Sequence, residues 1–210
     1  MFRFQVDGRL ERGELRLDIE LNLAPGRYVV RGENGSGKTS LLRLVAGLDM
    51  LSHGAVAIDG VPLDQPAPRR FVPAHQRDVA MAFQTPHLFD HLSVRNNVAY
   101  PLRRRQSPAS PEPFLARVGA EELSHRRPSE LSGGQAQRVA LPRALANQAS
   151  TLLLDEPLAA ISQQDRGDLM ETLERSGATW TLWVSHDPTE PTSFDGEIVV
   201  DPQRGARLND

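Results

Sequence analysis

The stretch that decides the fold is Gly32-Glu33-Asn34-Gly35-Ser36-Gly37-Lys38-Thr39. Two glycines with four residues between them precede a lysine and a hydroxyl residue, which is the spacing of a phosphate-binding loop. Such glycines let successive backbone amides converge on phosphate oxygens, and the helix that follows points its positive N-terminus at the same anion. We expect Lys38 to reach the β- and γ-phosphates and the Thr39 hydroxyl to ligate magnesium. The residues predicted to bind phosphate are Gly32, Asn34, Gly35, Ser36, Gly37, Lys38, Thr39 and Ser40.

The alternative is an ordinary turn before a helix, with Lys38 as a solvated charge. A chance match in a chain of this length has a probability on the order of 1%. The surroundings also favour the phosphate loop, because a predicted strand at 27–31 precedes it and apolar residues at helical spacing (41–48) follow it.

Short apolar runs at 79–83, 151–154 and 179–184 are typical of strands buried on both faces of a mainly parallel sheet. The first 25 residues or so and the segment 54–64 alternate apolar and polar residues, which predicts antiparallel strands. The fold class is therefore α/β, a P-loop NTPase core with a small antiparallel β subdomain and a helical insert. We expect one domain over 1–210, with the core at 1–84 and 150–210 and the insert at 85–149.

Polar residues follow the predicted strands at their carboxyl ends, where open parallel sheets bind ligands. Asp155 could hold magnesium and Glu156 could polarise the attacking water, while Gln84 could contact either one. His186 could donate a hydrogen bond to the γ-phosphate. Each of these residues taken alone could equally be a solvated surface group, and their shared sheet edge is what favours the site.

A second helix start, Leu131-Ser132-Gly133-Gly134-Gln135, has the features of an anion site. Ser132 suits a helix cap, and each glycine inside the helix start would cost about 1 kcal/mol relative to alanine. The glycines therefore indicate that a phosphate approaches the backbone there. Two anion-binding helix starts with one phosphate loop predict a head-to-tail pair of chains, each completing the other's site.

The bulk composition excludes several classes of function. The chain has 210 residues, a net charge of -3 and no cysteine, so it offers no basic field for nucleic acid and no thiolate chemistry. The segment 1–10 lacks the apolar core of an export signal, and the longest apolar runs are far shorter than the roughly 20 residues of a membrane helix. A cytoplasmic location is the default expectation.

These segments in their order resemble the nucleotide-binding subunits of ATP-binding cassette (ABC) transporters, over residues from about 15 to 200. The resemblance implies ATP hydrolysis with Mg²⁺, two ATP molecules enclosed between two copies of the chain, and a membrane permease as partner. It implies that Asp155 is the metal-side acid, Glu156 the catalytic base and His186 the γ-phosphate switch. The residues that it places on the partner chain's nucleotide are Ser132, Gly133, Gly134 and Gln135.

The stretch from Gln76 to Val98 is similar to importer cassettes of the molybdate, sulfate, sugar and thiamine type. That likeness implies a solute-binding protein in the same system and a position on the inner face of the cell membrane, through the permease. Phe89 and Leu92 are candidate docking residues, and their alternative is packing inside the insert. The transported solute is not encoded in this chain.

Four features depart from the family pattern. Ser162 stands where members usually carry an aspartate, and Phe2 and Phe4 are the nearest aromatics for adenine although they lie early in the chain. Pro142 falls inside the signature helix and predicts a kink. Because few residues follow His186 in this sequence, we expect no accessory C-terminal domain.

Two other functions stay open. One is a regulator that binds ATP and dimerises but hardly turns over, against which Lys38, Glu156 and His186 argue. The other is a soluble cassette of DNA repair or translation, which usually has a long coiled-coil insert or a second cassette, and this sequence shows neither.

Overall fold

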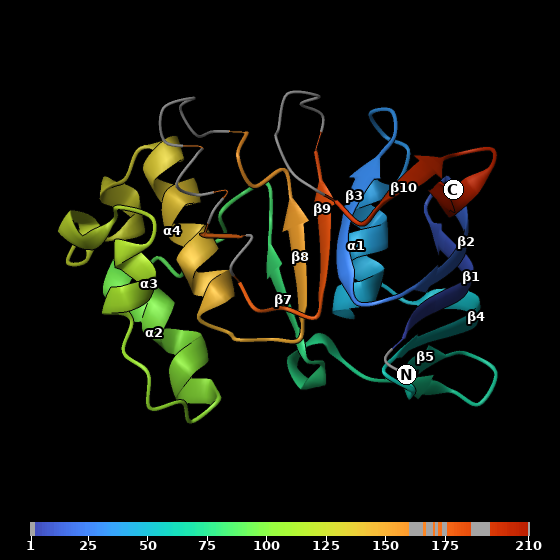
Figure 1. Cartoon of the computed structure of the whole chain (residues 1–210), viewed down its shortest axis with the longest axis horizontal. Coiled ribbons are helices and arrows are strands. Elements are labelled where there is room, and N and C mark those ends of the chain that lie inside the picture. Colours follow the sequence, from blue (N-terminus) through green and yellow to red (C-terminus); the bar gives the residue numbers. More distant parts are fainter. Residues whose placement is uncertain are drawn as a thin grey trace. The chain divides into compact units, whose positions relative to one another are not determined.

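The computed structural model describes residues 3–159, 166, 170, 172–173, 176–185 and 194–209. Contacts divide the chain into two compact units, Met1–Val79 with Thr179–Asp210, and Ala80–Ala178 (Figure 1). Three residues of the sequence predictions, Phe2, Ser162 and His186, lie outside the described residues. The predicted core and insert boundaries stay a prediction.

Antiparallel strands form one part of the first unit, as the alternating pattern predicted. They are β1 (Phe4–Arg12), β2 (Leu15–Leu23), β4 (Leu51–Ile58), β5 (Val61–Gln65) and β6 (Arg70–Phe71). β1 pairs with β2 on one side and β4 on the other. Every second residue of β2 from Leu17 to Leu23 is buried, and the residues between them are exposed. The sheet therefore has one apolar and one solvated face.

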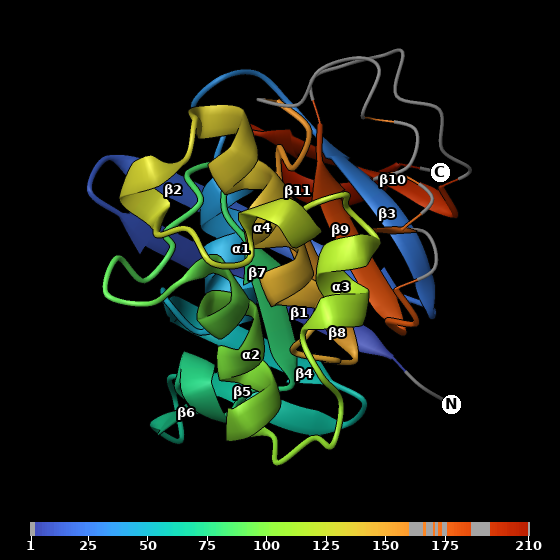
Figure 2. The same ribbon diagram turned by 90° about the vertical axis from the view of Figure 1, so that its left-hand side faces the viewer.

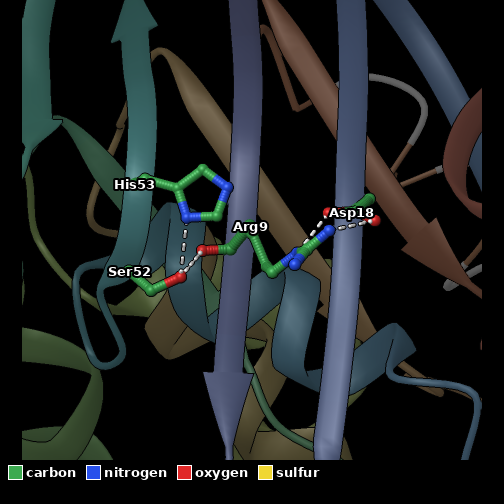
Figure 3. Close-up of polar contacts among 4 residues, drawn as sticks. All are labelled: Arg9, Asp18, Ser52 and His53. Atoms are coloured by element: carbon green, nitrogen blue, oxygen red, sulfur yellow. Dashed lines mark hydrogen bonds and ion pairs between the residues drawn. The ribbon is translucent and has the colours of Figure 1, made fainter.

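The solvated face shows how polar side chains link the strands across the register. Arg9 of β1 donates two hydrogen bonds to Asp18 of β2, at 2.6 and 2.9 Å, and Ser52 of β4 donates to the Arg9 carbonyl at 3.0 Å (Figure 3). The hydrogen bond from Arg9 lowers the pKa of the Asp18 carboxyl. Opposite charges directly across a strand pair favour this register over a slipped one.

The parallel part of the first unit is β3 (Gly26–Arg31), which lies between β9 (Trp180–Val184) and β10 (Gly196–Asp201). The sequence analysis missed β10 and β11 (Gly205–Asn209), an antiparallel hairpin. β11 also pairs in parallel with β2, so the predicted side sheet and the parallel strands form one sheet in this unit. Its strand order is β6-β5-β4-β1-β2-β11-β10-β3-β9.

Helix α1 (Lys38–Ala46) follows β3 directly and packs with apolar side chains that are fully buried: Leu41, Leu42, Leu44 and Val45. It contacts β9, the strand that pairs with β3. Gly37 before it and Gly47 after it both adopt left-handed backbone conformations, with φ of 107° and 76°. Elsewhere in this unit, η1 is a short 3-10 turn (Ala74–Gln76).

Helices dominate the second unit, as the prolines of the predicted insert suggested. They are α2 (Val94–Arg104), α3 (Glu112–Ala116) and α4 (Gly133–Leu145), with 3-10 turns η2 (Glu121–Leu123) and η3 (Pro128–Glu130) (Figure 2). α2 packs on α4, and α3 contacts both. The unit also holds β8 (Thr151–Asp155) and its neighbour β7 (Val79–Ala82), which starts at the unit boundary.

Two sequence expectations bear on these elements. Pro142 does not end α4, which continues to Leu145 while the Ala146 amide donates to the Pro142 carbonyl at 2.8 Å; the kink stays a prediction. Phe4 is fully buried with its ring 6.3 Å from that of Trp180, so it belongs to the core and cannot stack on adenine. Among the described helices, none is long and apolar enough to cross a membrane.

Candidate phosphate-binding site

Two glycines shape the loop between β3 and α1, and each is required for a different physical reason. A Cβ on Gly32 would overlap the Val200 carbonyl oxygen and lie 2.6 Å from the Ser36 hydroxyl, so only glycine leaves room there. Gly37, at φ 107°, ends the loop in a conformation that L side chains rarely adopt. The turn therefore requires the residue types that the phosphate-loop pattern specifies.

Lys38 is buried, with 6% of its surface exposed. Its ammonium group donates to the carbonyl oxygens of Gly32 (2.9 Å) and Glu33 (2.8 Å). This excludes the alternative of a solvated lysine at a turn. The charge is held over the loop by carbonyl dipoles, which a phosphate chain could replace as acceptors.

The loop also holds a buried polar atom that fits an anionic ligand. Ser36 is 1% exposed, and its hydroxyl has no hydrogen-bond partner among the residues that the structure describes. The α1 ladder begins with the Leu41 amide donating to the Gly37 carbonyl at 2.8 Å, and earlier amides of a helix have no intrahelical acceptor. A buried hydroxyl without a described partner, next to a helix N-terminus, suits a phosphate ligand.

Magnesium would be held at this site jointly by protein side chains and phosphate oxygens. Within the described part of the chain, no group of three His, Cys, Asp or Glu side chains could hold a metal ion. Magnesium at nucleotide sites takes most of its ligands from phosphate and water, with one or two from protein. The Thr39 hydroxyl, at the start of α1, suits that role, and Asp155 and Gln84 remain the other predicted ligands.

In the second unit the structure brings two predicted site residues together. The Gln84 side-chain amide donates to a Glu156 carboxylate oxygen at 3.1 Å. Asp155, the last residue of β8, is 3% exposed, whereas Glu156 is half-buried with a positive φ of 49°. The two adjacent acids thus occupy different surroundings, as two separate tasks require.

Sequence reasoning missed two residues that support this region. Gln137 of α4 is buried, and its amide lies 3.4 Å from the Phe83 carbonyl and 3.5 Å from the Pro157 carbonyl, beside Gln84 and Glu156 in the chain. Arg143 of α4 donates to the His87 carbonyl at 2.6 Å and the Pro86 carbonyl at 2.9 Å. The signal for Gln137 was a polar residue on the helix face that also carries buried apolar residues.

Phe89, a predicted docking residue, makes contacts inside the second unit. Its ring centroid lies 4.8 Å from that of Tyr100, and the Arg143 guanidinium lies 5.5 Å from it. Asn97, fully buried, accepts from the Phe89 amide and donates to the carbonyls of Phe89 and Leu92. Packing thus accounts for Phe89, and docking of Phe89 and Leu92 stays a proposal.

The second helix start is capped by its own residues. The Gln135 amide donates to the Ser132 hydroxyl at 3.3 Å, and the Ser132 amide donates to the Gln135 side-chain oxygen at 3.1 Å. This capping box confirms Ser132 as the cap of α4. A Cβ on Gly133 would meet no described residue within 4 Å, so packing against the described part of the chain does not require glycine there.

The predicted gathering of all these residues at one edge involves both units. The loop 32–39 belongs to the first unit, and Gln84, Asp155, Glu156 and the segment 131–135 belong to the second. Their assembly into one site stays a prediction, and His186 lies outside the described residues.

A glycine loop around a buried lysine, between a strand and a helix, defines a phosphate-binding α/β cassette. The capped Ser-Gly-Gly-Gln helix start indicates a smaller class within these cassettes. The family described as "ABC transporter" matches residues 17–159. The chain belongs to this family.

Curated relatives are named as import or transport ATP-binding proteins. The chain is 40% identical over 193 residues to the molybdenum import ATP-binding protein of Aromatoleum aromaticum, covering 88% of this chain and 51% of the relative. It is 39% identical to an Fe(3+) import ATP-binding protein of Agrobacterium fabrum (87% and 53%) and 36% to a putrescine transport ATP-binding protein of Escherichia coli K12 (87% and 49%). The chain spans about half the length of these relatives.

Solved structures agree on the fold. The dimeric structure of MJ0796, a bacterial ABC transporter cassette, matches with a TM-score of 0.78 and 25% identity, over 100% of this chain and 97% of that one. A dimeric post-hydrolysis state of the same cassette, bound to ADP and Pi, matches with a TM-score of 0.77 and 24% identity, over the same shares. These matches confirm the predicted fold class.

The open space around Gly133 leads to a stability prediction. Replacing Gly133 by alanine should leave the free energy of unfolding unchanged or raise it by up to about 1 kcal/mol, because alanine favours a helix and meets no neighbour. Chemical denaturation followed by far-UV circular dichroism measures this. Gly32→Ala is the matched comparison and should destabilise the fold, since its Cβ overlaps the Val200 carbonyl. A clear loss of stability in Gly133→Ala would show a packing need for that glycine.

Proposed function

We propose that this chain is the ATP-hydrolysing subunit of an ABC importer. The observation that carries the proposal is the buried Lys38 ammonium, held on loop carbonyls beside a buried Ser36 hydroxyl without a described partner. Together with the N-terminus of α1, these donors are suited to a polyphosphate. The names of the relatives and the family support transport as the use of that energy.

The chain's own groups account for the binding step. As the phosphate chain enters the loop, the Lys38 ammonium exchanges the Gly32 and Glu33 carbonyls for β- and γ-phosphate oxygens. The Ser36 hydroxyl gains the hydrogen-bond partner that none of the described residues gives it. The Thr39 hydroxyl, with Asp155 and Gln84, would hold Mg²⁺, which would supply positive charge to offset the charge that develops on the phosphoryl group.

Hydrolysis then needs an oriented water. Glu156 takes a proton from the water whose oxygen bonds to the γ-phosphorus, while the bond from that phosphorus to the bridging oxygen breaks and this oxygen leaves with ADP. The Gln84 amide, 3.1 Å from the Glu156 carboxylate, keeps this carboxylate oriented before substrate arrives. His186 completes the proposal as a donor to the γ-phosphate, and phosphate and ADP are released.

The base in this proposal can be tested by a nearly isosteric change. Glu156→Gln should bind MgATP with an affinity within a few-fold of the unmodified chain and lose at least 100-fold in kcat, because the amide cannot accept a proton. Steady-state phosphate release and nucleotide titration measure the two quantities. Undetectable turnover in the unmodified chain, despite tight ATP binding, would instead support the regulatory alternative that Ser162 raises.

The second copy of the chain enters through α4. The Ser132 cap uses the Gln135 side chain, yet the space around Gly133 is open within the chain. A glycine that costs helix stability and has no packing reason is typical of a functional contact. We infer that a partner's nucleotide fills this space, so each site joins the loop of one chain to the helix start of another.

Mixing two inactive variants tests this arrangement. Lys38→Ala lacks a working loop, and Ser132→Arg blocks the helix start, so each alone should hydrolyse ATP at less than a hundredth of the normal rate. In a mixed dimer the intact loop of one chain meets the intact helix start of the other, and hydrolysis should return. Titrating one variant against the other at fixed total protein gives the curve. Activity in the Ser132→Arg protein alone would rule out the shared site.

Import and membrane attachment belong to this proposal as well. Relatives of similar identity are named for molybdenum, iron and putrescine, so they support the importer class and do not indicate one solute. We expect the chain to sit on the cytoplasmic face of the membrane through a permease that works with a solute-binding protein. Affinity purification from membranes in mild detergent should recover a polytopic membrane protein; ribosomes or DNA in its place would favour the non-transport alternative.

A further inference from the structure

The C-terminal end of α1 is held by one buried arginine, Arg77, which is 5% exposed. Its Nη1 donates to the carbonyls of Leu44 (2.8 Å) and Val45 (2.9 Å) in the last turn of α1. Its Nε donates to the Val72 carbonyl at 2.7 Å and its Nη2 to the Leu63 carbonyl of β5 at 3.4 Å. A single planar group therefore fastens the helix to the antiparallel strands.

The surroundings of Arg77 are built for a cation. The carbonyls at a helix C-terminus carry partial negative charge, and the guanidinium lies on them. The Phe71 ring centroid lies 5.3 Å from its central carbon, and the Asp64 carboxyl adds an attractive charge. Burial lowers the pKa of Arg77 to about 10, so it keeps its charge at neutral pH.

Gly47, the C-cap of α1, makes room for this group. A Cβ on Gly47 would lie 2.5 Å from the Arg77 Nε and 2.9 Å from its Cζ, and φ is 76°. Both the conformation and the close approach require glycine, so the cap and the arginine form one fitted contact.

This contact lies at the opposite end of α1 from the phosphate loop. A helix of nine residues is about 13.5 Å long, so a tilt of about 4° at its C-terminus displaces its N-terminus by about 1 Å. A displacement of that size at a catalytic site can cost on the order of 100-fold in rate. We propose that Arg77 is a positioning residue for the phosphate loop, which fixes the direction of α1 and with it the amides and Lys38. The proposal rests on the nucleotide site proposed above.

Lysine cannot replace arginine in this role. The guanidinium presents a rigid fork of donors that reaches carbonyls from three segments at once, whereas an ammonium group is a point charge on a flexible chain. Arg77→Lys therefore keeps the charge and loses the geometry, and Arg77→Met removes both.

The experiment measures the Kd for MgATP of folded protein, well below the Tm of each variant. We expect Arg77→Lys and Arg77→Met to raise Kd at least tenfold and to raise KM in steady-state phosphate release. Arg43→Gln is the matched control, because Arg43 also lies in the last turn of α1; the change breaks its 2.8 Å ion pair with Asp49 and should alter Kd less than twofold. Leu23→Ala, at a fully buried position in β2, should lower the Tm of the same unit and leave Kd within twofold.

Each outcome either supports or contradicts a positioning role for Arg77. A Kd within twofold of the unmodified value in Arg77→Lys, or an equal loss of affinity in Leu23→Ala, would show that Arg77 contributes stability alone. If Arg77→Met does not fold, Arg77→Lys is sufficient for this test. Failure of the unmodified chain to bind MgATP would count against the proposed function itself, before any variant is compared.

Discussion

The contact between the Lys38 ammonium and the Gly32 and Glu33 carbonyls is the interaction on which the site depends. Burying a charge is costly unless dipoles replace its water, and here the loop's own carbonyls do so. This requires the loop to curl around the side chain, which Gly32 permits because no side chain could pass the Val200 carbonyl. The position of Val200 in β10 therefore helps to determine the shape of the loop, as the glycines do.

The two ends of α1 suit charged groups of opposite sign. Its N-terminus presents amides and the Lys38 charge to an anion, and its C-terminus receives the Arg77 guanidinium. Both arrangements agree with the direction of the helix dipole. The apolar side chains between the two ends are buried, so the helix is closely packed in its unit. A closely packed helix moves little when the loop binds a ligand.

The sequence predicted what local patterns encode. The glycine loop, the apolar runs at β3, β7, β8 and β9, and the Ser132 cap depend on neighbours a few residues away, and the structure contains each of them. Arg77, Gln137 and Arg143 could not be predicted in the same way, because their partners are backbone carbonyls distant in sequence. A polar side chain in isolation is read as solvated, and only the folded chain shows that it is buried. Phe4 failed for the same reason, since its exposure depends on Trp180.

The helix start at Ser132 differs from the loop because one of its glycines, Gly133, has no packing role among the described residues. At the loop, two glycines have reasons inside the chain: Gly32 avoids a carbonyl and Gly37 closes a turn. At α4 the capping box satisfies Ser132 and Gln135 with each other, and yet Gly133 has open space where alanine would stabilise the helix. Natural sequences accept such a local cost where function requires it. The lack of described neighbours at Gly133 is therefore one of the observations that support the proposed contact with a second copy's nucleotide.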